Sequence, residues 1–438
     1  MILEPINISV VAPTGAGKTA LISTICDYIK KNSNKAKGFT IKITNSAAEE
    51  LNNFATNLSG QLASKNMNFN SGLIKGTTEC TEYEFSIVFK DRKTNVEVAQ
   101  PFKILDIPGA FINNPSKYED DSEYKKFISH LDQSRILWIP VDAAVMMEAV
   151  SDNQKGYSAI IRRVSNLEDF ILEWSDFAAE NDTIDYCNFV LVKSESYFSQ
   201  DFDKKYNCCI NQFNESYGPL IEKIKERNTQ DKLSCVAVET IGSIKVNSAK
   251  WDPKDHSCKV DYEVCDTQRN IRGADCLLND AMKVAKENIQ KHIDVIKASK
   301  QDEVSKFDAQ KRELIEEHRR KINQLEQIKN TLSNDLYKLN EQKRELSEKG
   351  WWDKFSNLWN DNIDKLEERI RRTEATIESK GDQIDREKDK LEYIERNVDF
   401  AHQNLQNAQE QLASFNSLLS QLNNLGIKDI NTVYYRSL

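Results

Sequence analysis

Residues 12–19 read Ala-Pro-Thr-Gly-Ala-Gly-Lys-Thr, between the apolar run Ile6–Val11 and a helix-like stretch at Thr19–Lys31. A strand, a glycine-rich turn and a helix in this order form a phosphate-binding loop, whose backbone N–H groups converge on phosphate oxygens at the helix N-terminus. Gly15 and Gly17 allow the unusual dihedrals and the close approach that such a loop needs. The octapeptide therefore predicts an α/β fold and a ligand that carries phosphates.

Each position of the loop has a chemical role, although Ala12 stands where the usual motif has its first glycine. We expect Lys18 to neutralise the β- and γ-phosphates and the Thr19 hydroxyl to bind Mg²⁺. A chance glycine-rich turn is the alternative, and the flanking strand and helix argue against it. The residues predicted to contact the nucleotide here are Thr14, Gly15, Ala16, Gly17, Lys18, Thr19 and Ala20.

The composition excludes several classes of protein. The chain has 438 residues, enough for two or three domains, and a formal net charge of −9, which argues against capture of nucleic acid. It has no apolar run long enough to span a membrane and no signal-peptide pattern, so we expect a cytoplasmic protein with reduced thiols. Its nine cysteines form no CxxC pair. A metal site is the weaker interpretation of four scattered residues, because their spacing fits no usual zinc pattern: His256, Cys258, Cys265 and Cys276.

Short apolar runs alternate with polar helical stretches over residues 1–284, which predicts a mostly parallel sheet with helices on both faces. The expected strands are Ile6–Val11, Tyr83–Phe89, Phe102–Asp106, Ile136–Val141, Phe189–Val192 and Cys235–Val238. The expected helices are Thr19–Lys31, Glu123–Leu131, Ala159–Ala179, Lys204–Glu226 and Ala274–Ala285. The pattern does not assign Asn32–Asn70, and Val246–Asn270 reads as a loop or a small hairpin.

Residues 285–425 have a different character, with few glycines or prolines and many charges. Apolar residues recur at intervals of three and four from Ile363 to Leu422, a heptad seam that is typical of a coiled coil. A break near Gly350 predicts an antiparallel hairpin with arms of about 60 residues, roughly 90 Å long. One continuous helix in a parallel dimer is the rival geometry. The tail at 426–438 is apolar enough to dock on the first domain or on a second subunit.

A second phosphate-side motif, Asp106-Ile107-Pro108-Gly109, ends a buried-type strand. An Asp at this place holds Mg²⁺ through water, and the N–H of Gly109 reaches the γ-phosphate. Upstream, Thr78 is the preferred residue to close over Mg²⁺, with Thr77 and Thr81 as alternatives. The predicted metal ligands are Thr19, Thr78 and Asp106, and the predicted catalytic residues are Lys18, Thr78, Asp106 and Gly109.

The segment Leu191-Val192-Lys193-Ser194-Glu195 follows the two phosphate-side motifs in the chain. The order of the three motifs resembles that of the P-loop GTPases of the translation-factor-related (TRAFAC) class, over residues 5–285. The resemblance implies bound GTP or GDP with Mg²⁺, Lys193 along the purine ring, and Glu195 accepting protons from guanine. Thr240 would belong to the last short motif, which touches the base. Val192 replaces the family's polar residue, and Glu195 replaces its Asp.

Ala110 follows the Asp-x-x-Gly motif, where small GTPases carry a Gln that orients the attacking water. The methyl group of an alanine cannot do this. The resemblance therefore implies a GTPase that is slow on its own. We expect a homodimer or a higher oligomer, or a partner, to supply the missing group, and the nucleotide to control a coiled-coil lever.

Three tryptophans gather between the arms of the expected hairpin, within residues 350–360. Trp351, Phe355 and Trp359 share a helical face, with Trp352 beside them. They either cap the bend, bind a partner protein, or touch a membrane, which would make the protein peripheral there. A nucleotide-binding head with an apolar-tipped helical stalk resembles dynamin-like or septin-like GTPases in plan.

Two other functions remain open from the sequence. A coiled-coil ATPase of the ABC or chromosome-maintenance kind also joins a P-loop to a hairpin, but it places further motifs after the coiled coil. Nothing after Leu425 matches them, and Asp106 is followed by Ile107 rather than by Glu. The other alternative is a scaffold that binds nucleotide without turnover, which Ala110 would suit.

Overall fold

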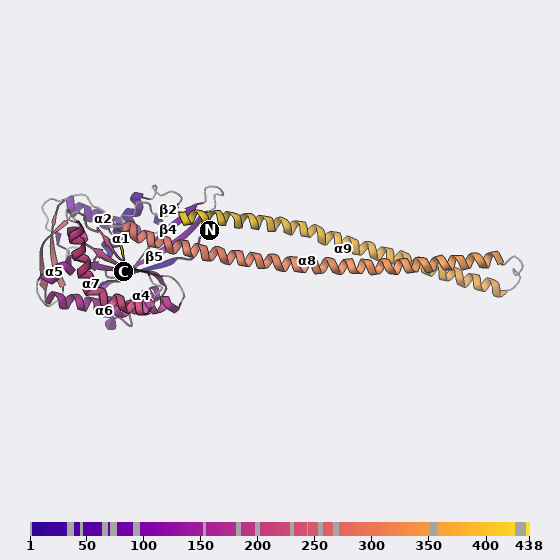
Figure 1. Ribbon diagram of the computed structural model, residues 1–438, viewed down its shortest axis with the longest axis horizontal. Helices are drawn as coiled ribbons and strands as arrows, with labels where there is room; N and C mark the ends of the chain where they lie inside the picture. Colours follow the sequence, from indigo (N-terminus) through magenta and orange to yellow (C-terminus); the bar gives the residue numbers. More distant parts are fainter. Residues whose placement is uncertain are drawn as a thin grey trace. The chain divides into compact units, whose positions relative to one another are not determined.

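The computed structural model of the chain divides by its internal contacts into two compact units. One joins Met1–His292 to Ser414–Leu438, and the other is Ile293–Ala413. The first is an α/β domain and the second a helical hairpin (Figure 1). The residues that the structure describes are 2–32, 39–43, 47–63, 69–70, 77–90, 97–151, 155–180, 185–197, 202–227, 232–242, 244–252, 257–265, 271–349, 357–424 and 435–438.

An eight-stranded, mostly parallel sheet organises the first unit, in the order β11-β8-β7-β6-β1-β5-β4-β2. Pairing is parallel from β8 across to β5, while β4, β2 and β11 join by antiparallel pairing. The strands are β1 (Ile6–Val10), β2 (Phe39–Ile43), β4 (Thr81–Lys90), β5 (Glu97–Asp106), β6 (Ser134–Asp142), β7 (Tyr186–Val192), β8 (Lys232–Val238) and β11 (Tyr435–Ser437).

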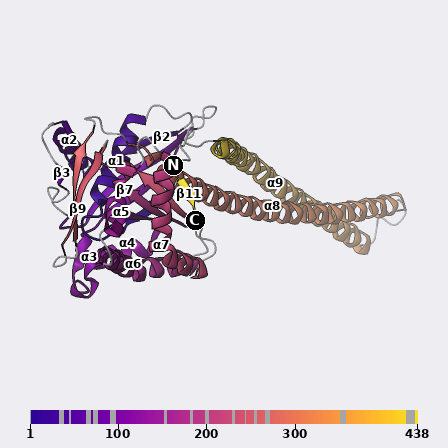
Figure 2. The same ribbon diagram turned by 60° about the vertical axis from the view of Figure 1, so that its left-hand side comes forward.

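Helices cover both faces of this sheet (Figure 2). Helix α6 packs against α4 and α7 on one face, and α1 lies on the other. Each residue of β7 is buried, as expected for a parallel strand that is covered on both sides. The α-helices that lie wholly within this unit among the described residues are α1 (Lys18–Asn32), α2 (Ala47–Ala63), α3 (Gly109–Asn113), α4 (Ser122–Asp132), α5 (Ala143–Ser151), α6 (Lys155–Glu180) and α7 (Phe202–Arg227).

The six strands expected from the apolar runs are all present, and so are the expected helices. Asn32–Asn70, which the pattern left unassigned, contains β2, α2 and β3 (Phe69–Asn70). Of the two alternatives for Val246–Asn270, a loop or a small hairpin, the structure has the hairpin: β9 (Ile244–Asp252) and β10 (Ser257–Val264) pair antiparallel and form a second sheet with β3. This sheet packs on α2 and α5 through a buried cluster that includes Leu58, Ala144, Val145, Val260 and Tyr262.

The second unit is formed by the greater part of two antiparallel helices, α8 (Ala274–Lys349) and α9 (Asn357–Asn424); α8 up to His292 and α9 from Ser414 belong to the first unit. The interhelical pairs fix the direction, because His318 contacts Glu387 at 2.7 Å and Lys343 contacts Glu367 at 2.9 Å. The antiparallel hairpin, rather than one continuous helix, is therefore the geometry of this chain. The expected boundary at residues 284 and 285 falls inside α8, which crosses it without interruption.

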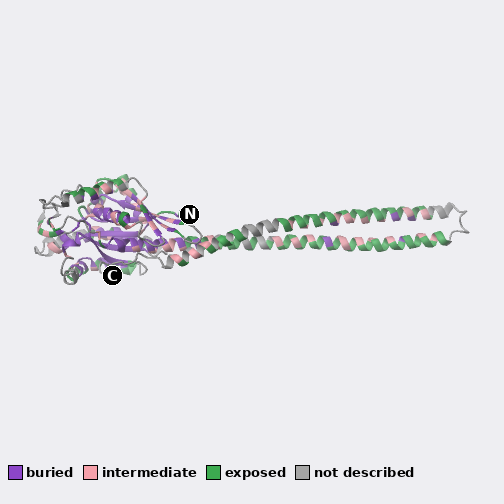
Figure 3. Cartoon of the chain, turned by 90° about the horizontal axis from the view of Figure 1, so that it is seen from above, coloured by how far each residue is buried: buried purple, intermediate pink, exposed green. Residues whose placement is uncertain are grey.

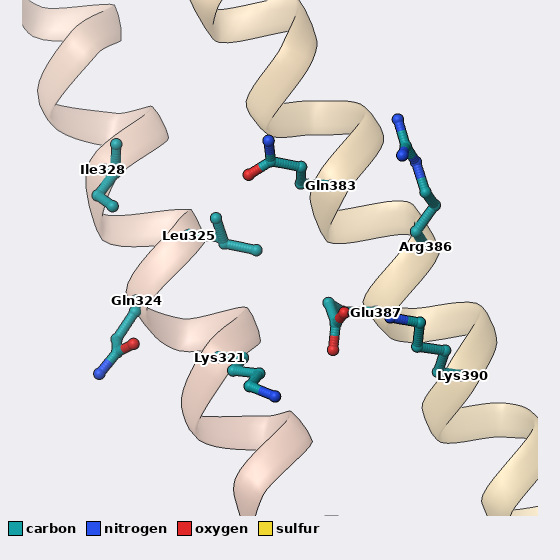
Figure 4. Close-up of a pocket in the computed structure, with 8 residues that line it drawn as sticks. All are labelled: Lys321, Gln324, Leu325, Ile328, Gln383, Arg386, Glu387 and Lys390. Atoms are coloured by element: carbon teal, nitrogen blue, oxygen red, sulfur yellow. Dashed lines mark hydrogen bonds and ion pairs between the residues drawn. The ribbon is translucent and has the colours of Figure 1, made fainter.

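Few side chains of the hairpin are fully buried, as the colours of its two arms show (Figure 3). Leu339, Leu366 and Ile370 form one small apolar cluster. Elsewhere the arms leave a pocket of about 390 Å³, into which Leu325, Gln383 and Glu387 point (Figure 4). Its lining residues are Lys321, Gln324, Leu325, Ile328, Gln383, Arg386, Glu387 and Lys390. A seam of this kind is held by ion pairs as well as by apolar contact.

Several predictions concern residues outside the described part of the chain. Trp351, Trp352 and Phe355 lie there, as do residues 425–434 of the tail. Trp359 belongs to α9. The last described residues form β11, so this part of the expected tail docks on the sheet of the first unit. No helix among the described residues is long and apolar enough to cross a membrane.

Helix α8 begins against the end of β8. Gly273 has a φ of +84°, and a Cβ atom there would lie 2.0 Å from the carbonyl oxygen of Ala237. The backbone N–H of Glu239 donates to the carbonyl of Arg272 at 3.0 Å. Only glycine combines this dihedral with this close approach, so the start of the helix is fixed to the strand.

We predict that Gly273→Ala destabilises the α/β unit by about 2–4 kcal/mol, since the methyl group meets a backbone oxygen in a strained conformation. Near-ultraviolet circular dichroism during urea unfolding would measure this. Gly60→Ala is the matched control, because nothing lies within 4 Å of a Cβ atom there and Gly60 is helical. It should stabilise the unit by about 0.5–1 kcal/mol. Equal effects of the two substitutions would contradict the close approach.

Candidate functional site

The candidate residues lie at one edge of the main sheet, where β1, β5, β6, β7 and β8 all end at their carboxyl termini. Strand β1 is central, with β5 on one side and β6 on the other. The chain leaves this edge toward both faces of the sheet, and ligands of open α/β sheets bind at such a point. The loop after β1 lies in the middle of this edge.

The loop from Ala12 to Thr19 turns at two glycines and holds a buried lysine. Gly15 and Gly17 have φ values of +79° and +98°. The ammonium of Lys18 is buried and donates to the carbonyl oxygens of Ala12 at 2.9 Å and Pro13 at 3.4 Å. Burial lowers the pKa of Lys18 to about 8, and the carboxylate of Asp106 partly opposes this. The cation is held beneath the loop, and Thr14 and Gly15 are exposed at its surface.

Three oxygen-bearing side chains meet beside this loop. The hydroxyl of Thr19 donates to Oδ2 of Asp106 at 2.7 Å, and the hydroxyl of Thr77 donates to the same atom at 3.2 Å. The two hydroxyl oxygens are 3.1 Å apart. Thr78, the preferred residue from the sequence, is exposed, and it is Thr77 that the structure brings to the other two.

Asp106 is only 1% exposed, and its Oδ1 atom has no hydrogen-bond partner among the described residues. Burial raises the pKa of Asp106, while the charge of Lys18, the two threonine hydroxyls and the backbone N–H of Ile107 lower it. A hard cation with its bound water would supply the missing donor. Mg²⁺ fits this set, because it takes one or two protein oxygens and fills its other positions with water and phosphate.

Gly109 touches the loop at residues 12–19 directly. A Cβ atom on Gly109 would lie 2.3 Å from the backbone nitrogen of Thr14. The amide of Asn113 donates to the hydroxyl of Thr14 at 3.3 Å, a contact that no sequence motif indicated. Ala110 follows in α3 and brings no polar side chain to this place.

Lys193 joins the loop to two neighbouring strands. Its ammonium donates to the carbonyl of Gly15 at 3.0 Å and to Oδ2 of Asp142 at 2.5 Å. Its backbone N–H donates to the hydroxyl of Thr240 at 3.3 Å. Sequence reasoning found Lys193 and Thr240 but missed Asp142. The sequence could have indicated Asp142 as a site residue, because it is an acidic residue at the end of an apolar strand.

Glu195 is buried against the turn that follows β8. Its Oε1 atom accepts from the backbone N–H groups of Thr240 at 2.5 Å, Ile241 at 2.6 Å and Gly242 at 3.2 Å. Its Oε2 atom is buried and has no partner within the described part of the chain. Burial raises the pKa of Glu195 to about 7, against the lowering effect of the backbone donors. One oxygen therefore holds the turn, and the other remains an acceptor.

The scattered cysteines and histidine do not form a second centre in the part that the structure describes. Cys276 is buried and Cys265 is exposed, while His256 lies outside the described residues. Across the described ranges, no three His, Cys, Asp or Glu residues are grouped so that they could hold a metal ion.

Comparison with known proteins adds no assignment. No protein-family model matches this chain, and no curated protein matches its sequence. Any statement of function therefore depends on the site itself.

The burial of Glu195 predicts a pH dependence of stability. Because its pKa rises from 4.5 to about 7 on folding, the folded chain binds more protons between these values, and stability falls as pH rises through this window. Glu195→Gln removes the titration. We therefore compare the free energy of unfolding of Glu195→Gln with that of the unsubstituted chain. The difference, variant minus unsubstituted, should be about 1–3 kcal/mol larger at pH 8 than at pH 5.

Urea unfolding at the two pH values measures this difference. An equal effect of Glu195→Gln at pH 5 and pH 8 would show that Glu195 stays ionised throughout this range and would contradict the prediction.

Proposed function

We propose that this chain is a GTP-binding protein of the P-loop GTPase class, which binds GTP and GDP with Mg²⁺ and hydrolyses GTP slowly. The observation that carries the proposal is the meeting of two half-sites at one sheet edge. Lys18, Thr19 and Asp106 form the phosphate half, and Glu195 with the turn after β8 forms the other. Lys193 connects them by its contact with Gly15.

The phosphate half suits a nucleoside triphosphate. Gly15 and Gly17 have the positive φ values that such loops use, and Lys18 supplies a buried cation next to the loop. Mg²⁺, when bound, would neutralise charge on the phosphates, with Thr19 and Thr77 as direct ligands. Asp106 would accept from the bound water, and its Oδ1 atom has no described side-chain partner that would compete.

The base half favours guanine over adenine. Guanine presents two neighbouring donors, N1–H and the N2 amino group, whereas adenine presents a lone pair at N1. When Glu195 is ionised, its free Oε2 atom is an acceptor, so it attracts the first arrangement and repels the second. Leaving such a buried acceptor unpaired is expensive, which is what makes this discrimination strong.

Slow hydrolysis follows from the residue after Gly109. Ala110 has no group that could orient an attacking water, so this loop contributes position and charge but no polar side chain there. A second copy of the chain or a partner protein would supply the missing group. The hydrolytic rate would then depend on assembly, which suits a switch more than a metabolic enzyme.

The nucleotide would act on the hairpin through β8. The turn at Thr240–Gly242 contacts Glu195, and two residues earlier the same strand end meets the start of α8 at Gly273. A change in the turn is therefore next to the first residues of the helix. The hairpin would in turn engage a partner protein or a membrane.

A scaffold that binds nucleotide without turnover is the second candidate, and Ala110 favours it. The coiled-coil ATPase is less well supported. Every described strand of the main sheet except β11 precedes α8, and the described chain after α9 holds only β11. The motifs that such an ATPase needs after its coiled coil have no described element to carry them.

Isothermal titration calorimetry with GTP, GDP and ATP tests the proposal. We expect GTP and GDP to bind more tightly than ATP. Glu195→Ala should weaken both guanine nucleotides by about tenfold or more and leave ATP unchanged, because only guanine donates to this carboxylate. Lys18→Ala is the control, since it should remove binding of all three. Equal loss of ATP and GTP with Glu195→Ala would contradict guanine recognition.

The Mg²⁺ dependence of binding separates the two threonines. Mg²⁺ should increase the affinity for GTP about tenfold less in Thr77→Val than in the unsubstituted chain. Valine has nearly the shape of threonine, so the substitution removes only the hydroxyl that would bind the metal. Thr78→Val, its neighbour, should have less than about a twofold effect. Titrations with Mg²⁺ and with EDTA measure both, and the reverse order would assign the role to Thr78.

A further inference from the structure

The ammonium of Lys193 is held from two sides in a nearly closed environment. Oδ2 of Asp142 lies 2.5 Å from it and the carbonyl oxygen of Gly15 lies 3.0 Å from it. The side chains of Lys193 and Asp142 are only 9% and 4% exposed. The pair therefore links the end of β6 to the phosphate loop with little water to screen it.

The backbone of Lys193 is also in an unusual state. Its φ is +55°, and no other described residue apart from glycines has a positive φ. A lysine in this region costs free energy, and such residues persist where their surroundings fix them. The anchors here are Asp142, the Gly15 carbonyl and the hydroxyl of Thr240, which accepts from the Lys193 N–H.

Asp142 is itself fixed by a separate contact. Its Oδ1 atom accepts from the backbone N–H of Val145 at 3.0 Å, at the start of α5. One oxygen therefore caps the helix while the other faces Lys193. The residue before the lysine, Val192, is apolar and buried, so its side chain offers no anchor from β7.

We propose that Asp142 is a positioning residue that holds Lys193 against the phosphate loop. The stem of Lys193 lies against the loop, because its Cε atom would be 3.7 Å from a Cβ atom on Gly17. Because Asp142 fixes the ammonium, the hydrogen bond from Lys193 to the Gly15 carbonyl is always formed. This bond holds the loop in the conformation that would bind phosphate. The consequence for nucleotide release rests on the proposed function, but the effect on the loop does not.

Asp142→Asn isolates the charge. The amide oxygen of Asn keeps an acceptor for Val145, and the side chain keeps its size, while the charge-assisted bond to Lys193 is lost. In the nucleotide-free chain, we expect deuterium exchange of the peptide that covers residues 12–19 to become about tenfold faster. Asp121→Asn is the matched control, because Asp121 caps α4 through Glu123 in the same way and is exposed. It should leave this exchange unchanged.

A double-mutant cycle with Lys193→Met shows whether Asp142 acts through the lysine. Asp142→Asn should change exchange of the loop by less than about twofold when Lys193 is already methionine. A full additional effect in that background, or no effect of Asp142→Asn alone, would overturn the proposal. A merely structural loss at the α5 cap would give the full effect in both backgrounds.

Release of a fluorescent GDP analogue provides the second readout. Asp142→Asn should accelerate release by about tenfold, and the cycle with Lys193→Met should again remove the effect. If the unsubstituted chain binds neither GDP nor GTP, the proposed function fails. The exchange measurement still decides the role of Asp142 in that case.

Discussion

The parallel register of β1 with its neighbours is the constraint on which the site depends. Val10, the last residue of β1, lies opposite Asp106 on β5 and opposite Trp138 on β6. Asp106 therefore lies beside the loop that leaves β1, with no need for a long or flexible side chain to reach Thr19. A register shift of one residue would turn Asp106 to the other face of the sheet and remove the carboxylate from the loop.

The site is electrostatically unusual because its charges are withdrawn from water before any ligand is considered. Burial acts against the charged forms of Lys18, Asp106 and Glu195 alike. Two carboxylate oxygens, one on Asp106 and one on Glu195, are buried without a described donor. Each such atom costs about 1–3 kcal/mol, which a ligand that brings a donor would recover. The burial that costs folding stability would therefore favour binding of a ligand that brings donors to these oxygens.

Much of this could be read from sequence, for physical reasons that differ between elements. Buried parallel strands are apolar runs, so β6, β7 and β8 were predictable, and residues that follow parallel strands must share an edge. The choice of Thr77 over Thr78 was not predictable, because it depends on how one loop turns. Asp142 was missed because an Asp at the end of a strand is also what a helix cap requires. Its contact with Lys193, 51 residues further along the chain, is visible only in the folded structure.

The outermost strand of the sheet constrains the order in which the molecule forms. β11 pairs Tyr435 with Val236 and Ser437 with Ser234, so the edge of β8 receives its partner only after the whole hairpin has been made. About 200 residues separate the two strands, which corresponds to about 10–40 s of synthesis at about 5–20 residues per second. During that interval the backbone groups along β8 face outward and are available to other chains. Until Tyr435–Ser437 pair with β8, this edge of a nascent copy is open to pairing with a neighbouring chain, and β11 closes it.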